Sequence, residues 1–319
     1  MDRRGFLFAT AGVAGLGAAA ETFPIPIIDT HIHLFDPTRS QGVPWPEKTD
    51  PVLYKPALPE RYRRVTKGLG IVGAIEVEAS PWLEDNQWVL DVAAKDKIIV
   101  GTVGDLEPGK PDFRKNLERF HRNPLFLGIR YGNLWSRYLG EALSRPEFIS
   151  DLRALADANQ ALDSANPNPP LIEALVRLSD RVPNLRLVVD HLPQLDPPGE
   201  KPARAAYEYN LRELGKRPQV YVKVSEVLRR VGGRVPTGLD FYKPRLDEIW
   251  EIFGEDRLLY GSDWPNSDKW GTYLQVMSIV REYFTRKGRE AAEKFFWENS
   301  VKAYHWVKRN PTQPQLNFL

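Results

Sequence analysis

The chain has 319 residues, and its 44 lysines and arginines against 42 aspartates and glutamates give a formal net charge of +2. Hydrophobic residues make up 42% and charged residues 27%, which excludes an intrinsically disordered chain and a multi-span membrane protein. The balanced charge offers no basic excess for nucleic acid, and the absence of cysteine excludes disulfides, thiolate nucleophiles and iron–sulfur clusters.

The first twenty residues predict an export signal. A charged start, a short apolar run and a small-residue end are the parts of a secretory signal. The pair Arg3 and Arg4 followed by Phe-Leu resembles a twin-arginine signal, which an exporter of folded proteins reads transiently. The run is too short and glycine-rich to span a bilayer, so no stable membrane insertion is expected. We expect residues 1–20 to be removed, a mature start near Glu21, and a periplasmic location in a bacterium.

The rest of the chain alternates short apolar runs with amphipathic stretches. The predicted strands are 25–28, 72–77, 98–103, 125–129, 160–163, 185–189, 220–224 and 258–260. The clearest predicted helices are 84–95, 112–122, 146–158, 171–182, 203–216, 244–253 and 273–287.

Eight apolar strands that alternate with helices predict a closed (β/α)8 TIM barrel of α/β class. We expect residues 21–319 to form this one domain, with an extra C-terminal helix over 289–307. The alternative is a doubly wound open sheet. Such a sheet carries a glycine-rich phosphate turn after its first strand, whereas this chain has Asp-Thr-His-Ile-His there.

Two histidines follow the first predicted strand. His31 and His33 are two residues apart, so on an extended chain both imidazoles point to the same side. At the carboxyl end of a barrel strand they can chelate one divalent metal. The alternative is a pair of loop histidines hydrogen-bonded to backbone.

Two more candidates end later strands. His191 follows Leu-Val-Val-Asp, and Asp263 follows Leu-Leu-Tyr-Gly-Ser. Polar residues at the carboxyl ends of barrel strands are usually catalytic. Taken alone, His191 is better interpreted as a barrel-end histidine with satisfied hydrogen bonds, and Asp263 as a helix N-cap. Because His31, His33, His191 and Asp263 all lie at the ends of predicted strands, together they favour a functional site.

Three of these motifs carry a resemblance. Asp29-Thr30-His31-Ile32-His33, Val189-Asp190-His191 and Gly261-Ser262-Asp263-Trp264-Pro265 resemble the amidohydrolase superfamily, and within it the amidohydrolase-related (type 2) branch of lactonases. The resemblance covers about residues 24–307.

The resemblance implies a TIM-barrel, metal-dependent hydrolase. Its metal set would be His31, His33, His191 and Asp263, with zinc the expected ion. The fourth strand ends in Arg130, where two-metal members carry a bridging group, so one metal is expected. Some pyrone-type lactonases of the branch act without metal, which leaves metal-free action open.

Three residues are expected to bind a small-molecule substrate. Arg130 offers a planar guanidinium that fits a carboxylate, and a salt bridge to Glu78 is its alternative. Glu78 is expected near the site. Trp264 is expected to form an aromatic wall for the substrate, and packing within the barrel is its alternative. Glu76 and Lys223 are expected to be buried structural charges.

The predicted reaction is the opening of a lactone of a sugar acid or cyclic carboxylate. Asp263 would take a proton from the attacking water, and His191 would help polarise the carbonyl. The alternatives are a metal-dependent decarboxylase of the same superfamily and a noncatalytic exported binding protein.

Overall fold

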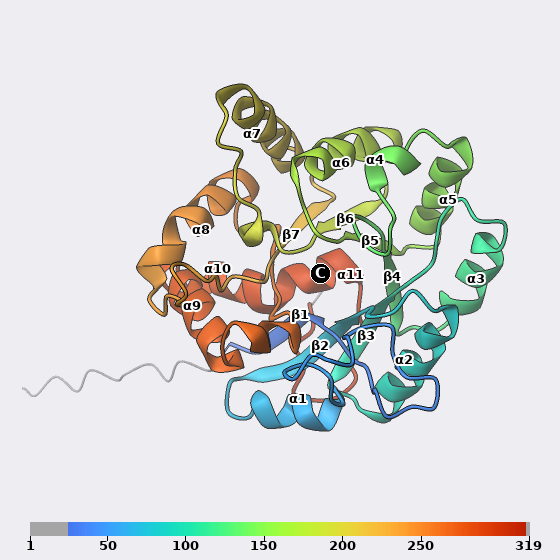
Figure 1. Cartoon of the computed structure of the whole chain (residues 1–319), viewed down its shortest axis with the longest axis horizontal. Coiled ribbons are helices and arrows are strands. Elements are labelled where there is room, and N and C mark those ends of the chain that lie inside the picture. The colour runs from blue at the N-terminus through green and yellow to red at the C-terminus, as the bar shows by residue number, and fades with distance from the viewer. Residues whose placement is uncertain (1–24, 317–319) are drawn as a thin grey trace, which may run out of the picture.

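Eight parallel strands form the centre of the molecule, and helices surround them (Figure 1). The structure is a computed structural model that describes residues 25–316. The predicted export signal and mature start at Glu21 therefore lie outside the described residues. The strands are β1 (Ile27–Ile32), β2 (Ile71–Val77), β3 (Ile99–Gly104), β4 (Phe126–Arg130), β5 (Ala161–Ser164), β6 (Arg186–Val189), β7 (Val220–Val224) and β8 (Leu258–Tyr260). Each strand pairs with the next along the chain, so the TIM-barrel prediction is confirmed.

Backbone hydrogen bonds between the ends of β1 and β8 close the barrel. The amide of His33 donates to the carbonyl of Trp264 at 2.7 Å, and the amide of Asp263 donates to the carbonyl of His31 at 2.8 Å. Closure therefore occurs beside the predicted site residues, which fixes the first and last strands relative to each other.

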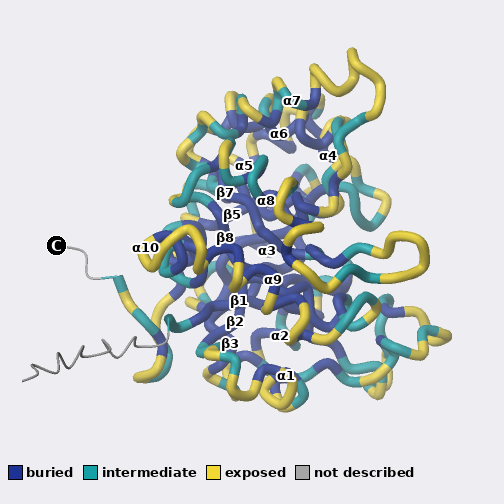
Figure 2. The backbone as a smooth tube through the Cα atoms, turned by 90° about the vertical axis from the view of Figure 1, so that its left-hand side faces the viewer, coloured by how far each residue is buried: buried dark blue, intermediate teal, exposed yellow. Residues whose placement is uncertain are grey.

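Amphipathic helices pack their apolar faces on the outside of the barrel, so burial falls from the centre outward (Figure 2). The helices before the C-terminal segment are α1 (Pro59–Val65), α2 (Leu83–Lys95), α3 (Phe113–Phe120), α4 (Leu139–Ala142), α5 (Pro146–Asp157), α6 (Pro169–Arg181), α7 (Lys201–Gly215), α8 (Leu239–Phe253) and α9 (Tyr273–Arg286). Helix α8 begins five residues before the predicted start at Pro244, which lies inside its first turns. Pro244 leaves one intrahelical carbonyl without its amide donor, yet the helix runs through it, so the proline does not mark the boundary.

The C-terminal segment covers the amino ends of the strands, where it crosses the barrel centre in Figure 1. The single helix predicted over 289–307 is divided into α10 (Arg289–Glu293), a π-helical turn (Lys294–Glu298) and α11 (Asn299–Tyr304). Helix α11 ends at Tyr304, because His305 takes a left-handed conformation with φ 54°. Tyr304 packs into the barrel interior and donates to the Asp163 carboxylate at 2.9 Å.

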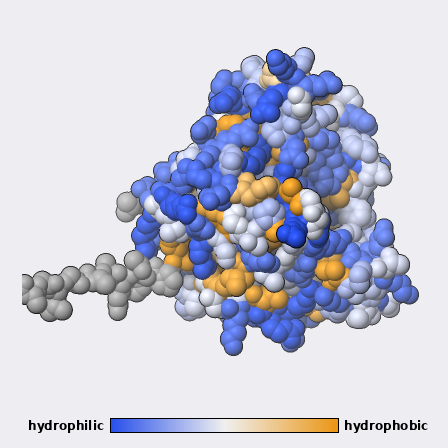
Figure 3. Space-filling view, turned by 60° about the vertical axis from the view of Figure 1, so that its left-hand side comes forward, coloured by the Kyte–Doolittle hydropathy of each residue, from blue (hydrophilic) through white to orange (hydrophobic). Residues whose placement is uncertain are grey.

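The face shown in Figure 3 mixes hydrophobic and hydrophilic side chains. Among residues 25–316, none of the helices is both long and apolar enough to cross a membrane.

Candidate active site at the carboxyl ends of the strands

His31 lies near the end of β1, and His33 follows it directly. The His33 Nδ1 lies 2.7 Å from the carbonyl oxygen of Val77 at the end of β2. A carbonyl can only accept, so Nδ1 carries the hydrogen and the lone pair is on Nε2. That Nε2 lies 3.2 Å from Oδ1 of Asp263. The backbone therefore orients His33 with its free lone pair toward the predicted aspartate.

Asp263 lies at the centre of the cluster. Its Oδ1 is 3.2 Å from His33 Nε2, 3.6 Å from His31 Nε2 and 3.9 Å from His191 Nε2. The ring centroids of His31 and His191 are 4.4 Å apart. All four predicted metal-site residues therefore meet around one carboxylate oxygen, although they lie far apart in the sequence.

The backbone at two of these residues is strained. His191 has φ 54° and Asp263 has φ 58°, a left-handed conformation that costs a non-glycine residue about 1–3 kcal/mol. Hydrogen bonds hold both: Ser225 Oγ accepts from the His191 amide at 3.3 Å, and the His31 carbonyl accepts from the Asp263 amide at 2.8 Å. Strain of this kind concentrates at functional sites, where it aims a side chain.

Burial keeps the imidazoles neutral. It lowers the pKa of His33 to about 4, with the Arg130 charge acting in the same direction, and it lowers the pKa values of His31 and His191 well below the usual range. Burial raises the pKa of Asp263 to about 7, against the opposing hydrogen bond from Asn266. Three neutral imidazoles around a carboxyl group form a donor set suited to a divalent metal.

The residues present fit such an ion. His31 Nε2 is fully buried and has no hydrogen-bond partner among residues 25–316, which is costly unless an ion engages it. Ligand atoms of His31, His33 and Asp263 all lie within 4.8 Å of one another, as do those of His191, Glu226 and Asp263. The clusters therefore provide nitrogen and oxygen ligands for a divalent metal.

A buried lysine supports the cluster from inside the barrel. Lys223 on β7 is fully buried, and its Nζ lies 2.5 Å from Asp163 Oδ2, 3.1 Å from Asp190 Oδ1 and 3.2 Å from His31 Nδ1. A buried charge requires such partners. Lys223 and its carboxylates therefore fix one side of the His31 ring, as expected of a buried structural charge.

Arg130 at the end of β4 forms the salt bridge that was the alternative to substrate anchoring. Its Nε donates to Glu78 Oε1 at 2.8 Å and its Nη2 to the Glu78 carbonyl at 2.9 Å. The Trp135 indole also donates to Glu78 Oε2, at 3.1 Å. Nη1 faces Asp190 Oδ2 at 3.8 Å, longer than a hydrogen bond. The ion pair therefore fixes Arg130 beside the site through its Nε and Nη2. Its Nη1 makes no hydrogen bond to Glu78.

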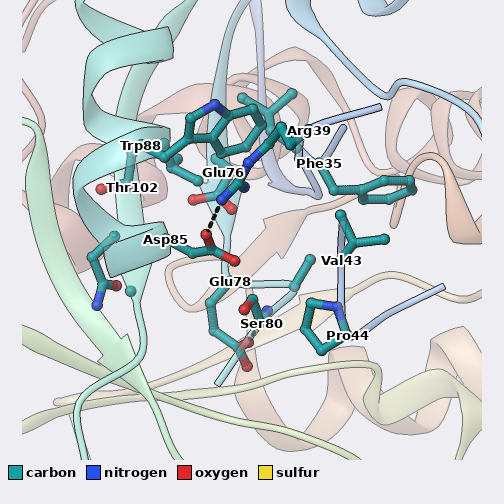
Figure 4. A pocket seen from close by; sticks show the side chains of 15 residues that line it. Phe35, Arg39, Val43, Pro44, Glu76, Glu78, Ser80, Asp85, Trp88 and Thr102 are labelled. Carbon is teal, nitrogen blue, oxygen red and sulfur yellow. Dashed lines mark hydrogen bonds and ion pairs between the residues drawn. The ribbon is translucent and has the colours of Figure 1, made fainter. Parts of the chain in front are cut away.

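A pocket lies on the other side of Glu78 (Figure 4). Glu76 of β2 and Glu78, directly after that strand, border it together with Ser80 and the ion pair of Arg39 with Asp85. Glu76 is buried, as predicted, and burial raises its pKa well above its usual range. Its Oε1 lacks a hydrogen-bond partner in the described part of the chain. This pocket shares Glu78 with the site.

The structure takes the packing alternative for Trp264. Trp264 has no exposed surface, and its ring packs against Tyr62 at 5.3 Å and under the Arg61 guanidinium. It contributes to packing and offers no exposed wall to a substrate. Trp45 is the ring that contacts His33, edge-on at 5.5 Å.

Sequence reasoning missed Glu226 and Asn266. Glu226 follows β7 with φ 47°, and Asn266 Nδ2 donates to Glu226 Oε1 at 2.9 Å and to Asp263 Oδ2 at 2.7 Å. The position of Glu226 two residues beyond a strand was the available signal. Neither a left-handed backbone nor this bridging amide can be read from residue spacing.

A model of the amidohydrolase family matches residues 28–306, which is most of the chain and contains every residue of this cluster. This chain belongs to the amidohydrolase family. It is thus a hydrolase of the amidohydrolase type.

Two curated relatives share one name. An L-fucono-1,5-lactonase of Burkholderia ambifaria is 28% identical over 286 residues, covering 87% of this chain and 94% of the relative. An L-fucono-1,5-lactonase of Burkholderia multivorans is 24% identical, covering 85% and 92%.

Solved structures share the fold at lower identity. A Burkholderia multivorans amidohydrolase with bound zinc is 20% identical with a TM-score of 0.76, covering 88% of this chain and all of that one. A probable 2-pyrone-4,6-dicarboxylic acid hydrolase of Acinetobacter baumannii, with citric acid bound, is 19% identical with a TM-score of 0.68, covering 88% and 99%.

Proposed function

We propose that this amidohydrolase opens the lactone ring of a sugar acid or a cyclic carboxylate. The observation that carries the proposal is the position of Asp263, whose Oδ1 lies 3.2–3.9 Å from nitrogens of three histidines. The two relatives named L-fucono-1,5-lactonase favour a sugar lactone as the substrate. The site has no need of a covalent intermediate, since the chain has no cysteine and Asp263 can activate water directly.

The reaction needs one proton carrier. Asp263 takes a proton from the water that attacks the lactone carbonyl, and returns it to the ring oxygen as the ester bond breaks. The products of the lactone and the water are thus one hydroxy acid. Asn266 holds Oδ2 of Asp263 at 2.7 Å, which leaves Oδ1 to face the histidines. His191 would polarise the lactone carbonyl, and Arg130, held by Glu78, would orient a carboxylate or hydroxyl of the substrate.

The metal that we propose for this site is zinc, held by His31, His33, His191 and Asp263. A bound zinc ion acts as a Lewis acid toward a carbonyl and lowers the pKa of water. The zinc bound to the Burkholderia multivorans structure supports the choice of ion.

We also propose that residues 1–20 direct export through the twin-arginine route and that the enzyme acts in the periplasm. The support is the sequence of the segment itself, with its arginine pair, apolar run and alanine-rich end.

A substrate panel tests the reaction. Proton release is followed in a weakly buffered solution with L-fucono-1,5-lactone, other aldonolactones, 2-pyrone-4,6-dicarboxylate and aromatic carboxylates. Lactone hydrolysis that saturates with substrate, and that is retained by the surface variant Asp157→Asn, supports the proposal. Turnover of an aromatic carboxylate with carbon dioxide release, and of no lactone, would assign the enzyme to the decarboxylases instead.

A further inference from the structure

A cleft of about 580 Å³ lies among the loops that follow β2, β3 and β4. These loops stand at the carboxyl ends of the strands, the same end of the barrel that carries the histidine cluster. Pro81, Asp105 and Trp135 line the cleft, one from each loop, and we call it the Trp135 cleft. Its volume is typical of small-molecule sites, which measure about 300–1,000 Å³.

Trp135 connects this cleft to the candidate active site. Its indole nitrogen donates to Glu78 Oε2 at 3.1 Å, and Glu78 Oε1 accepts from Arg130 Nε at 2.8 Å. Arg130 Nη1 lies 3.8 Å from Asp190 Oδ2, and Asp190 Oδ1 lies 3.5 Å from His31 Nδ1. An unbroken series of neighbouring side chains therefore leads from the cleft to the histidines.

The turn that carries Trp135 is strained and firmly held. Trp135 and Ser136 are consecutive residues in the left-handed region, with φ 55° and 57°. Both guanidinium ends of Arg137 donate to the Asp105 carboxylate, at 3.0 Å and 2.6 Å, and the Arg137 amide donates to the Leu134 carbonyl at 3.0 Å. Backbone strain that is held by its surroundings in this way is typical of functional sites, where it fixes the position of a side chain.

The charges that line the Trp135 cleft disfavour an anionic ligand. Three carboxylates and two cations line it, namely those of Asp105, Glu107, Asp112, Lys110 and Arg137. Lys110 Nζ lies 3.6 Å from Glu107 Oε1, and Arg137 is bound to Asp105. Among the described residues that line the cleft, each cation thus has a carboxylate partner. The remaining balance is negative, so a carboxylate or a phosphate would gain little there.

An uncharged sugar ring suits this lining better. A hydroxyl group both donates and accepts, so it can bond to the Arg137–Asp105 pair without breaking it. The carbon-bound hydrogens of a sugar can pack against the tryptophan ring and against the apolar side chains of Pro81 and Leu83, which also line the cleft. The cleft therefore combines an aromatic surface with fixed polar groups, as a ring that carries several hydroxyls requires.

We propose that the Trp135 cleft binds a second sugar ring of the substrate, so that the enzyme acts on the lactone of a glycosylated aldonic acid. This inference rests on the proposed lactonase function and names its substrate class. Trp135 is the residue that binds the added ring, while the lactone ring lies at Asp263 and Arg130. Binding energy from a remote part of a substrate can raise kcat/KM, which gives the cleft a measurable effect.

The test compares lactones that share one reacting ring. The full-length protein supplied with Zn²⁺ is assayed by proton release on D-glucono-1,5-lactone and on cellobiono-, maltobiono- and melibiono-1,5-lactone, with the uncatalysed rate subtracted. The last three carry the same lactone ring and an added sugar in different linkages. We expect kcat/KM for at least one of them to exceed that for D-glucono-1,5-lactone by about tenfold or more.

Two substitutions of Trp135 separate its ring from its hydrogen bond. Trp135→Phe and Trp135→Leu both remove the donor to Glu78, so both should slow the single-ring lactone alike. Trp135→Phe should keep a preference for the glycosylated lactone, whereas Trp135→Leu should lose it. Trp82→Leu, at an exposed tryptophan that does not line the cleft, should keep both wild-type values. If the wild-type preference survives in Trp135→Leu, Trp135 only positions Glu78 and the proposal is overturned.

Binding of the product acids separates this inference from lactone opening itself. Titration calorimetry with gluconate, cellobionate, maltobionate and melibionate requires no turnover, and all four acids carry one negative charge. At least one disaccharide acid should bind about tenfold more tightly than gluconate, and Trp135→Leu should remove the difference. Tighter binding without hydrolysis of any lactone would refute the lactonase function but retain the sugar site. Equal binding of all four acids, with no gain in kcat/KM from the added ring, overturns the proposal even where D-glucono-1,5-lactone is hydrolysed.

Discussion

Replacing Arg130 by methionine tests whether its pair with Glu78 is structural, functional or both. The two side chains are 7% and 5% exposed, and the Nε to Oε1 distance is 2.8 Å. Removal of one partner from a buried pair leaves the other charge uncompensated and costs about 3–5 kcal/mol. The Trp135 indole still donates to Glu78, which places the expected loss for Arg130→Met near the lower end, about 3 kcal/mol.

The assay is urea unfolding of the metal-free protein followed by circular dichroism, together with KM for an anionic and a neutral lactone. The double variant Arg130→Met/Glu78→Met should recover most of the stability, because a buried pair can be exchanged for apolar residues at little cost. If Arg130 also anchors a substrate carboxylate, KM for the anionic lactone should stay raised in the double variant by an amount worth about 2–4 kcal/mol. If the free energy of unfolding of Arg130→Met falls by less than about 1 kcal/mol, Arg130 and Glu78 do not form a buried pair that the fold depends on.

Three further predictions concern the surroundings of the site and the leader. Ser225→Ala removes the hydroxyl 2.8 Å from His191 Nδ1 and should weaken zinc binding by about 10–100-fold in a competition titration, whereas Ser164→Ala, on strand β5, should leave it unchanged. Lys223→Met leaves two buried carboxylates without their cation, so the free energy of unfolding should fall by about 3–5 kcal/mol, and an unchanged urea midpoint would contradict the network. Changing Arg3 and Arg4 to lysine should retain the protein in the cytoplasm in cell fractionation, and normal export would remove the twin-arginine interpretation.

The barrel was predictable because each strand is a short apolar run buried on both sides. β7 is an example: Val220, Val222 and Val224 alternate with Tyr221 and Lys223, and all five are buried. Only Lys223 is inconsistent with such a run, and it marks the interior network. Helix limits were less certain, since proline stands inside α8 and the C-terminal segment changes to a π turn that has no sequence signal.

The candidate site was predictable in its residues but not in its contacts. Strand ends located His31, His33, His191 and Asp263 at the mouth, and the structure brings them together. Which way a polar group turns after a strand depends on left-handed backbone and on partners far along the chain. The partnership of Glu226 with Asp263, and the burial of Trp264 against Tyr62, depend on such tertiary contacts.

The most direct test of the proposed mechanism is kcat of Asp263→Asn on a lactone, with zinc content measured on the same preparation. The amide keeps the volume of the side chain and can still accept from Asn266, so the fold should persist, but an amide does not take a proton from water near neutral pH. We predict that kcat falls by at least about 10²-fold even when zinc is restored, and that KM changes far less. A variant with full zinc and nearly wild-type kcat would contradict the role of Asp263 as the base.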